Sequence, residues 1–168
     1  MFAAGRRYVN KNGFTLAEVV ISIFLVVVVI GVTHVLGAHV LNTCHINRDR
    51  AEVAENLRVG LNRLSRELRL ADGFASFTPD NGGRVAFANT MGDTISYHVG
   101  ISGDNERASQ LIRAISGKGN NPVARYINGI RVDPADAGTD TRVVTVTLTG
   151  EKGRSGSVEL GTTVRLRN

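Results

Sequence analysis

Residues 13–41 have the sequence GFTLAEVVISIFLVVVVIGVTHVLGAHVL, and this apolar stretch decides how the rest of the chain is organised. No Lys, Arg, Asp or Glu occurs in the 29 residues between Glu18 and Arg48. Because a helix of about 20 apolar residues crosses a lipid bilayer, the sequence predicts a membrane-spanning helix over Val19–Leu41. The alternative, a core helix of a soluble protein, is disfavoured because so small a domain could hardly cover the segment on all sides.

Basic residues dominate the N-terminal side of this stretch. The first 13 residues contain Arg6, Arg7 and Lys11 and no acid, so they account for +3 of the formal net charge of +5. Basic residues hold their side of a span in the cytoplasm, and we therefore expect a single-pass protein of the cytoplasmic (inner) membrane with its C-terminal domain outside. The charge excess that remains is too small to indicate direct nucleic-acid binding.

The junction between the basic segment and the apolar stretch carries a motif. Gly13 precedes Phe14, and Glu18 is the only acid in the first 48 residues. This GFTLAE motif, followed by an uninterrupted apolar span, resembles the processing site of type IV prepilins and type II secretion pseudopilins. The resemblance implies that a prepilin peptidase cuts between Gly13 and Phe14, removes residues 1–13 as a leader and methylates the new amino group of Phe14.

Glu18 is physically unusual in this position. A carboxylate at the edge of the hydrocarbon is unfavourable unless it meets a cation. In a bundle of such subunits, the amino group of a neighbouring Phe14 is the obvious partner, and the family resemblance implies the same pairing. We therefore assign Glu18 to assembly; the alternative is a solvated position at the level of the lipid headgroups.

The helix is predicted to continue beyond the span and to become amphipathic. Four leucines at helical spacing form one stripe in residues 48–72: Leu57, Leu61, Leu64 and Leu68. The other faces carry arginines that we interpret as solvated, namely Arg58, Arg63, Arg66 and Arg69. A helix from Phe14 to about Asp72 would need two environments, lipid or a filament core for residues 14–47 and a C-terminal domain for residues 48–72.

Residues 73–168 are rich in strand and turn signals, with 14 of the 19 glycines and all three prolines. We predict strands over residues 84–89, 94–99, 110–115, 126–132, 143–149 and 158–166. Turns or loops are expected at residues 81–83, 117–122, 133–138 and 150–156. A long helix followed by an antiparallel sheet is an α+β arrangement, and the resemblance implies a type IV pilin-like fold.

Candidate catalytic and metal-binding residues do not converge. The spacing of His34, His39 and His45 does not place all three on one helical face, and Cys44 has no second cysteine to pair with. The acidic segment Asp133–Asp140 lacks EF-hand spacing, so an ordinary turn is favoured over a calcium site. We expect no enzyme activity, cofactor or metal.

The sequence therefore predicts a structural subunit. The end of the long helix and the later strands are similar, as a pattern only, to J-type pseudopilins and minor pilins. The expected partners are the prepilin peptidase, other pilins or pseudopilins, and an assembly platform in the inner membrane. The alternative is a bitopic membrane protein whose outer domain binds a ligand or partner without polymerising.

Overall fold

A computed structural model describes residues 13–72, 76–104, 106–133 and 143–166. The chain divides into two compact units, Met1–Thr43 and Cys44–Asn168. The 54-residue helix α1 (Leu16–Arg69) begins in the first unit and ends in the second. The predicted helix is confirmed, with ends two to three residues inside the predicted ones. The predicted divisions at residues 13, 47 and 72 remain predictions.

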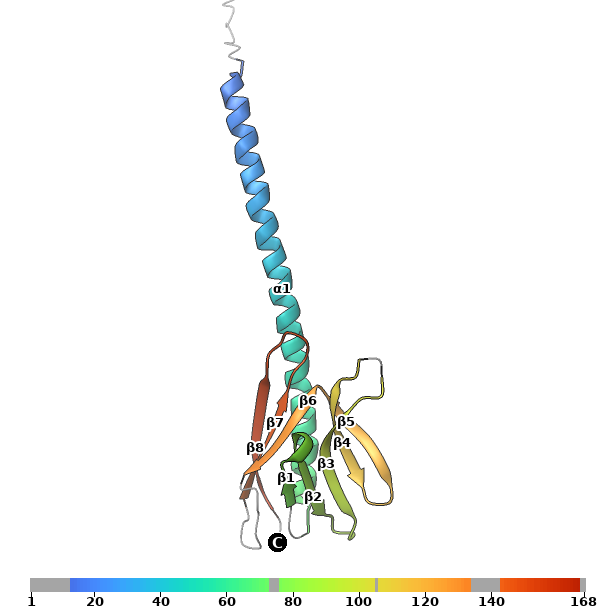
Figure 1. Ribbon diagram of the computed structural model, residues 1–168. Coiled ribbons are helices and arrows are strands. Elements are labelled where there is room, and N and C mark those ends of the chain that lie inside the picture. Colours follow the sequence, from blue (N-terminus) through green and yellow to red (C-terminus); the bar gives the residue numbers. More distant parts are fainter. Residues whose placement is uncertain (1–12, 73–75, 105, 134–142, 167–168) are drawn as a thin grey trace, which may run out of the picture. The chain divides into compact units, whose positions relative to one another are not determined.

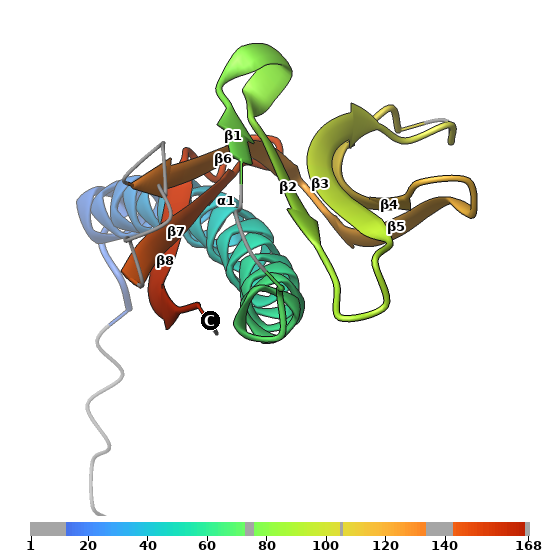
Figure 2. The ribbon, with the colours of Figure 1, turned by 90° about the horizontal axis from the view of Figure 1, so that it is seen from below.

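The second unit contains two antiparallel sheets around the C-terminal part of α1 (Figures 1 and 2). In each sheet, strands that follow one another in sequence are neighbours. The five-stranded sheet has the order β1 (Ser76–Thr78), β2 (Arg84–Ala88), β3 (Thr94–Ile101), β4 (Ser109–Ile115), β5 (Gly119–Arg125). The three-stranded sheet has the order β6 (Ile127–Asp133), β7 (Val143–Gly150), β8 (Val158–Arg165). The α+β arrangement predicted from the sequence is therefore confirmed.

The six predicted strands are confirmed to within two residues at each end. The prediction of a loop over residues 117–122 is wrong, because β5 begins at Gly119. Gly, Asn and Pro are typical of loops, but β5 is the edge strand of its sheet, where Pro122 does not remove a hydrogen bond from a central ladder. The register between β4 and β5 also shifts at Leu111/Ile112, close to the residue that pairs with Pro122. The short strand β1 was not predicted.

The turns are only partly described. Residues 81–83 form the predicted turn, since η1 (Asp80–Gly82) leads into β2 with positive φ at Gly83. The predicted loop at residues 150–156 joins β7 to β8. The predicted turn at 133–138 lies outside the described residues except for Asp133, which ends β6.

The leucine stripe of α1 forms the centre of the core. Leu57, Leu64 and Leu68 are fully or almost fully buried, and Leu61 is only 4% exposed. The sheets contribute the inward side chains of alternating positions, for example Val144, Val146 and Leu148 of β7. Phe87 and Tyr97 stack on neighbouring strands, with ring centroids 6.3 Å apart.

Gly60 lies where α1 meets both sheets. A Cβ atom at this position would lie 3.1 Å from a methyl carbon of each of three side chains, Leu111 of β4, Ile127 of β6 and Leu148 of β7. Glycine costs about 1 kcal/mol relative to alanine within a helix. At this position the absence of a side chain lets the helix approach the junction of the two sheets closely.

The burial pattern predicts how two helix variants differ in stability. In a fragment that begins at Asn47, Leu64→Ala should reduce the free energy of unfolding by about 2–5 kcal/mol, since Leu64 has no exposed surface. Arg69→Ala on the exposed face should change it by no more than about 0.5 kcal/mol. Urea unfolding curves of both variants provide the measurement. Equal, small losses would mean that the fragment does not pack its domain on the leucine stripe.

Candidate functional site

The start of α1 is built from Thr15 and Glu18. The backbone N–H of Thr15 donates to Glu18 Oε2 at 2.9 Å, and the Thr15 hydroxyl donates to the same oxygen at 3.0 Å. In return, the backbone N–H of Glu18 donates to Thr15 Oγ1 at 3.3 Å. This reciprocal pattern is a capping box, in which the two side chains satisfy amide groups that the first helical turn leaves without partners.

The capping box gives Glu18 a role that our sequence analysis missed. The signal was present, because Thr15 and Glu18 are three residues apart at the start of an apolar helical run. A carboxylate in the first turn also interacts favourably with the helix dipole. Glu18 therefore helps to define where the helix begins, whatever else it binds.

Gly13 and Phe14 precede the helix. Both are exposed, and 86% of the surface of Phe14 is accessible. Apart from the neighbours of Gly13 in the chain, no heavy atom of the described residues lies within 4 Å of the position that its Cβ would occupy. The Gly13–Phe14 peptide bond therefore lies outside the helix, and the other described residues leave it uncovered. Residues 1–12, which complete the predicted leader, lie outside the described residues.

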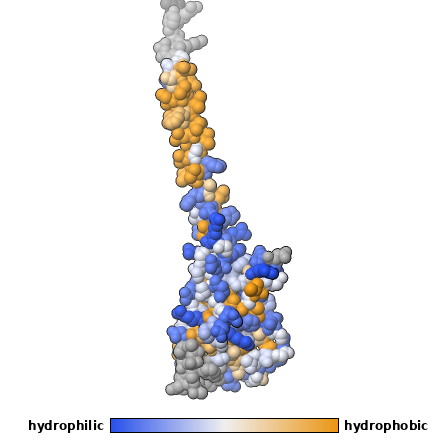
Figure 3. All heavy atoms as spheres, in the orientation of Figure 1, coloured by the Kyte–Doolittle hydropathy of each residue, from blue (hydrophilic) through white to orange (hydrophobic). Residues whose placement is uncertain are grey.

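The N-terminal part of α1 is long and apolar enough to cross a membrane (Figure 3). Its hydroxyl groups need no external partner, because Ser22, Thr33 and Thr43 each donate to the backbone carbonyl four residues earlier, at 2.7–3.0 Å. Internal hydrogen bonding of this kind is what a segment in lipid requires. By length and composition alone, this segment is consistent with membrane anchoring.

The other residues considered for chemistry remain separate. His34, His39, His45 and Cys44 are all exposed on α1. Within the described residues, no group of three or more His, Cys, Asp or Glu side chains is arranged to hold a metal ion. Of the Asp133–Asp140 segment only Asp133 is described, so the choice between a turn and a calcium site stays open.

A second polar cluster joins α1 to the loop between β7 and β8. Lys152 Nζ lies 2.6 Å from Glu52 Oε2 and 3.2 Å from Asp49 Oδ1. The hydrogen bonds to Glu52 and Asp49 hold the pKa of Lys152 above its ordinary value. The ammonium group also lies 5.0 Å from the centroid of the Tyr126 ring, within cation–π distance.

Tyr126 itself lies at the corner between β5 and β6, where the chain passes from one sheet to the other. Its φ of 61° is rare for a non-glycine residue. Backbone hydrogen bonds hold it on both sides: its N–H donates to Ser109 O at 2.6 Å, and its carbonyl accepts from Glu151 N at 3.0 Å. Its hydroxyl donates to Glu106 at 3.2 Å.

Two further contacts tie α1 to the five-stranded sheet. Arg113 of β4 donates from Nε to both carboxylate oxygens of Glu67 at 2.9 Å. Asn56 accepts a hydrogen bond from the backbone N–H of Arg125 at the edge strand β5, at 3.1 Å. None of these pairs was predicted, since each joins residues more than 45 positions apart in the sequence.

The arginines of the outer helix face are exposed, as predicted for Arg58, Arg63, Arg66 and Arg69. Two features of the chain are candidates for a functional role. One is the helix start with the exposed residues Gly13 and Phe14, and the other is the charged surface of the second unit. A scan of protein-family models and searches of curated proteins and solved structures find no match to the chain.

Proposed function

We propose that the chain is a structural subunit, a minor pilin or pseudopilin, that a prepilin peptidase processes and that assembles into, or primes, a type IV pilus or type II secretion pseudopilus. The observation that carries this proposal is the GFTLAE motif at residues 13–18, placed directly before an apolar helix. An ordinary membrane anchor needs neither a leader of this kind nor a carboxylate at the head of its span.

The structure of the helix start supports the processing step. A peptidase must bind its substrate in an extended form around the bond that it cuts. The Gly13–Phe14 bond lies two residues before the first helical residue, Leu16, and both of its residues are exposed. Cleavage there would leave Phe14 as a free amino terminus and keep the capping pair Thr15–Glu18 intact in the mature chain.

The amphipathic character of α1 supports the assembly step. Its N-terminal part exposes apolar side chains throughout, whereas its C-terminal part buries one stripe against the sheets. In this proposal the subunit resides in the cytoplasmic membrane with its N-terminus inside. An assembly platform then transfers it to a filament, where packing with the helices of other pilins replaces lipid. A non-polymerising bitopic receptor remains the second candidate, and the processing test below separates the two.

Replacing Gly13 tests the proposed cleavage. Gly13→Leu should block cleavage, because a peptidase that accepts glycine at this position approaches the backbone closely and a branched side chain would obstruct it. Intact-mass measurement of protein from cells that contain a prepilin peptidase should show N-methylated Phe14 as the first residue of wild type and Met1 in the variant. Ala17→Leu, four residues away, is the control and should be processed normally. A normal mature mass for Gly13→Leu would contradict the assignment, and an unprocessed wild type would favour the bitopic anchor.

Two substitutions of Glu18 separate its capping role from its proposed assembly role. Glutamine keeps an acceptor for the amide of Thr15 but carries no charge, whereas valine removes both. If Glu18 pairs with the amino group of a neighbouring Phe14, Glu18→Gln and Glu18→Val should both be cleaved normally and both assemble at least tenfold less well.

Thr15→Val is the matched control, because it removes the capping hydroxyl and leaves the Glu18 charge in place. Assembly is measured by chemical crosslinking of subunits in sheared filament fractions. Wild-type crosslinking by Glu18→Gln, with a loss only in Glu18→Val and Thr15→Val, would assign Glu18 to capping alone.

A further inference from the structure

The loop between β7 and β8 is a defined turn that presents one arginine at its tip. The Ser155 N–H donates to Lys152 O at 2.9 Å, and the Lys152 N–H donates to Ser155 Oγ at 3.0 Å. Ser155 is buried, whereas Gly153 and Arg154 are exposed. With its two ends fixed in this way, the turn has Gly153 and Arg154 at its tip.

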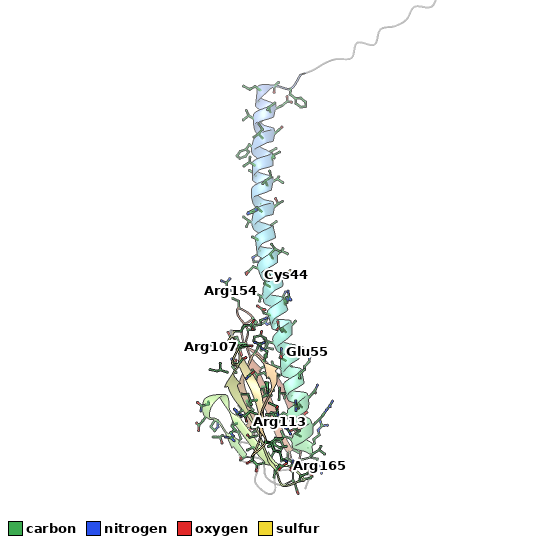
Figure 4. The ribbon with its side chains drawn as sticks, turned by 90° about the vertical axis from the view of Figure 1, so that its right-hand side faces the viewer. Cys44, Glu55, Arg107, Arg113, Arg154 and Arg165 are labelled. Atoms are coloured by element: carbon green, nitrogen blue, oxygen red, sulfur yellow. The ribbon has the colours of Figure 1, made fainter. Side chains whose placement is uncertain are left out.

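The tip of this turn lies beside the first turns of the C-terminal unit's helix. Lys152 binds Asp49 and Glu52, and a Cβ at Gly153 would lie 3.4 Å from Asp49 Oδ2. Figure 4 shows Arg154 close to the level of Cys44, the first residue of this unit. The turn therefore places Arg154 near the part of α1 that contains Arg48 and Arg50, the two residues beside Asp49.

Most acids in this region form ion pairs, whereas three arginines form none with the described residues. Lys152 occupies Asp49 and Glu52. Glu55 lies 3.7 Å from Arg58. Arg48, Arg50 and Arg154 are exposed and make no ion pair with any described residue. Glu151 is the one exposed acid of this loop without an ion pair to a described residue, so the unpaired charge here is positive.

Two of these arginines, Arg48 and Arg50, follow the predicted span closely in the sequence. Arg48 follows Leu41 by seven residues, about 10 Å along a helix. The headgroup layer on each side of a bilayer is about 5–8 Å thick. Long arginine side chains extend toward such an interface. A guanidinium group also matches phosphate oxygens in geometry and charge.

We propose that Arg48, Arg50 and Arg154, the juxtamembrane arginine cluster, bind the phosphates of anionic phospholipid headgroups. This inference needs the span but not processing or polymerisation, so it goes beyond the proposed function. Lys152 has two roles in this proposal. It holds the β7–β8 turn at the helix, and its single positive charge offsets part of the negative charge of Asp49 and Glu52, which would otherwise repel phosphate more strongly. Each arginine near an anionic surface contributes about 1 kcal/mol, or about a fivefold change in affinity.

The test uses the full chain purified in detergent and titrated with lipid in native mass spectrometry. The two lipids are phosphatidylglycerol, which is anionic, and phosphatidylcholine with the same acyl chains, which is zwitterionic. Wild type should bind phosphatidylglycerol at least tenfold more tightly. The variant Arg48→Gln/Arg50→Gln/Arg154→Gln should lose that preference, and Arg154→Gln alone should weaken it about fivefold.

The matched control is Arg66→Gln/Arg69→Gln/Arg165→Gln, which removes three exposed arginines that have no ion pair to a described residue and lie elsewhere on the unit; Figure 4 shows Arg165 far from Cys44. It should keep the preference for phosphatidylglycerol. Equal binding of the two lipids by wild type, or an equal loss in the control, would overturn the proposal. Unchanged lipid binding by the triple variant Arg48→Gln/Arg50→Gln/Arg154→Gln would also overturn it.

Arg6, Arg7 and Lys11 of an unprocessed chain would add their own attraction for anionic lipid, so all three are replaced by Gln in every chain that is titrated. A failure of cleavage at Gly13 would leave this titration unaffected, so the lipid test and the pilin proposal fail independently.

Discussion

The C-terminal unit depends on the burial of one stripe of α1 between two sheets. Each sheet has one face of apolar side chains that are buried in the core, for example Val85 and Leu111 of one sheet and Val146 and Leu148 of the other. Leu57, Leu64 and Leu68 provide an apolar partner for both faces at once. Gly60 favours the close approach, since a Cβ there would lie only 3.1 Å from methyl groups of β4, β6 and β7, which would have to shift to accommodate it.

Polar contacts around this apolar stripe set how the helix lies on the sheets. The Glu67–Arg113 pair and the Asn56–Arg125 hydrogen bond hold α1 to the five-stranded sheet. The Lys152–Glu52 pair holds the β7–β8 turn to α1. Partly buried ion pairs contribute little net stability, because desolvation offsets much of the attraction. Their effect here is better described as the selection of one position of the helix along the sheets, since a shift by one turn would separate Glu67 from Arg113.

The features that sequence reasoning found are those encoded by local periodicity. The 3.6-residue spacing of the leucines predicted the buried face, and the alternation of Val144, Val146 and Leu148 predicted a strand with one face inward. The features that sequence reasoning missed depend on where a segment lies in the folded sheet. β5 contains Gly, Asn and Pro, and only its edge position makes these acceptable in a strand. The chain passes from one sheet to the other at Tyr126, and no residue pattern indicates the positive φ of this residue.

At the candidate site, the motif predicted a role for Gly13, Phe14 and Glu18. The capping box was recognisable from the spacing of Thr15 and Glu18. It was missed because the charge of Glu18 was interpreted only as a contact with other subunits.

The charges of α1 are sorted in a way that serves two environments. In the C-terminal part, the acids Asp49, Glu52 and Glu67 pair with cations from the sheets, while most arginines face outward. In the N-terminal part, Glu18 pairs with groups of its own first turn. The C-terminal part packs on the sheets within one compact unit, so its acids find cations there. At the head of the apolar segment, the carboxylate of Glu18 instead accepts from the amide and the hydroxyl of Thr15. For the proposed membrane-bound subunit, the capping box would lower the cost of placing Glu18 near lipid. In the proposed filament, an incoming amino group would add a charge partner to a carboxylate already held in position, so little conformational freedom would be lost on pairing.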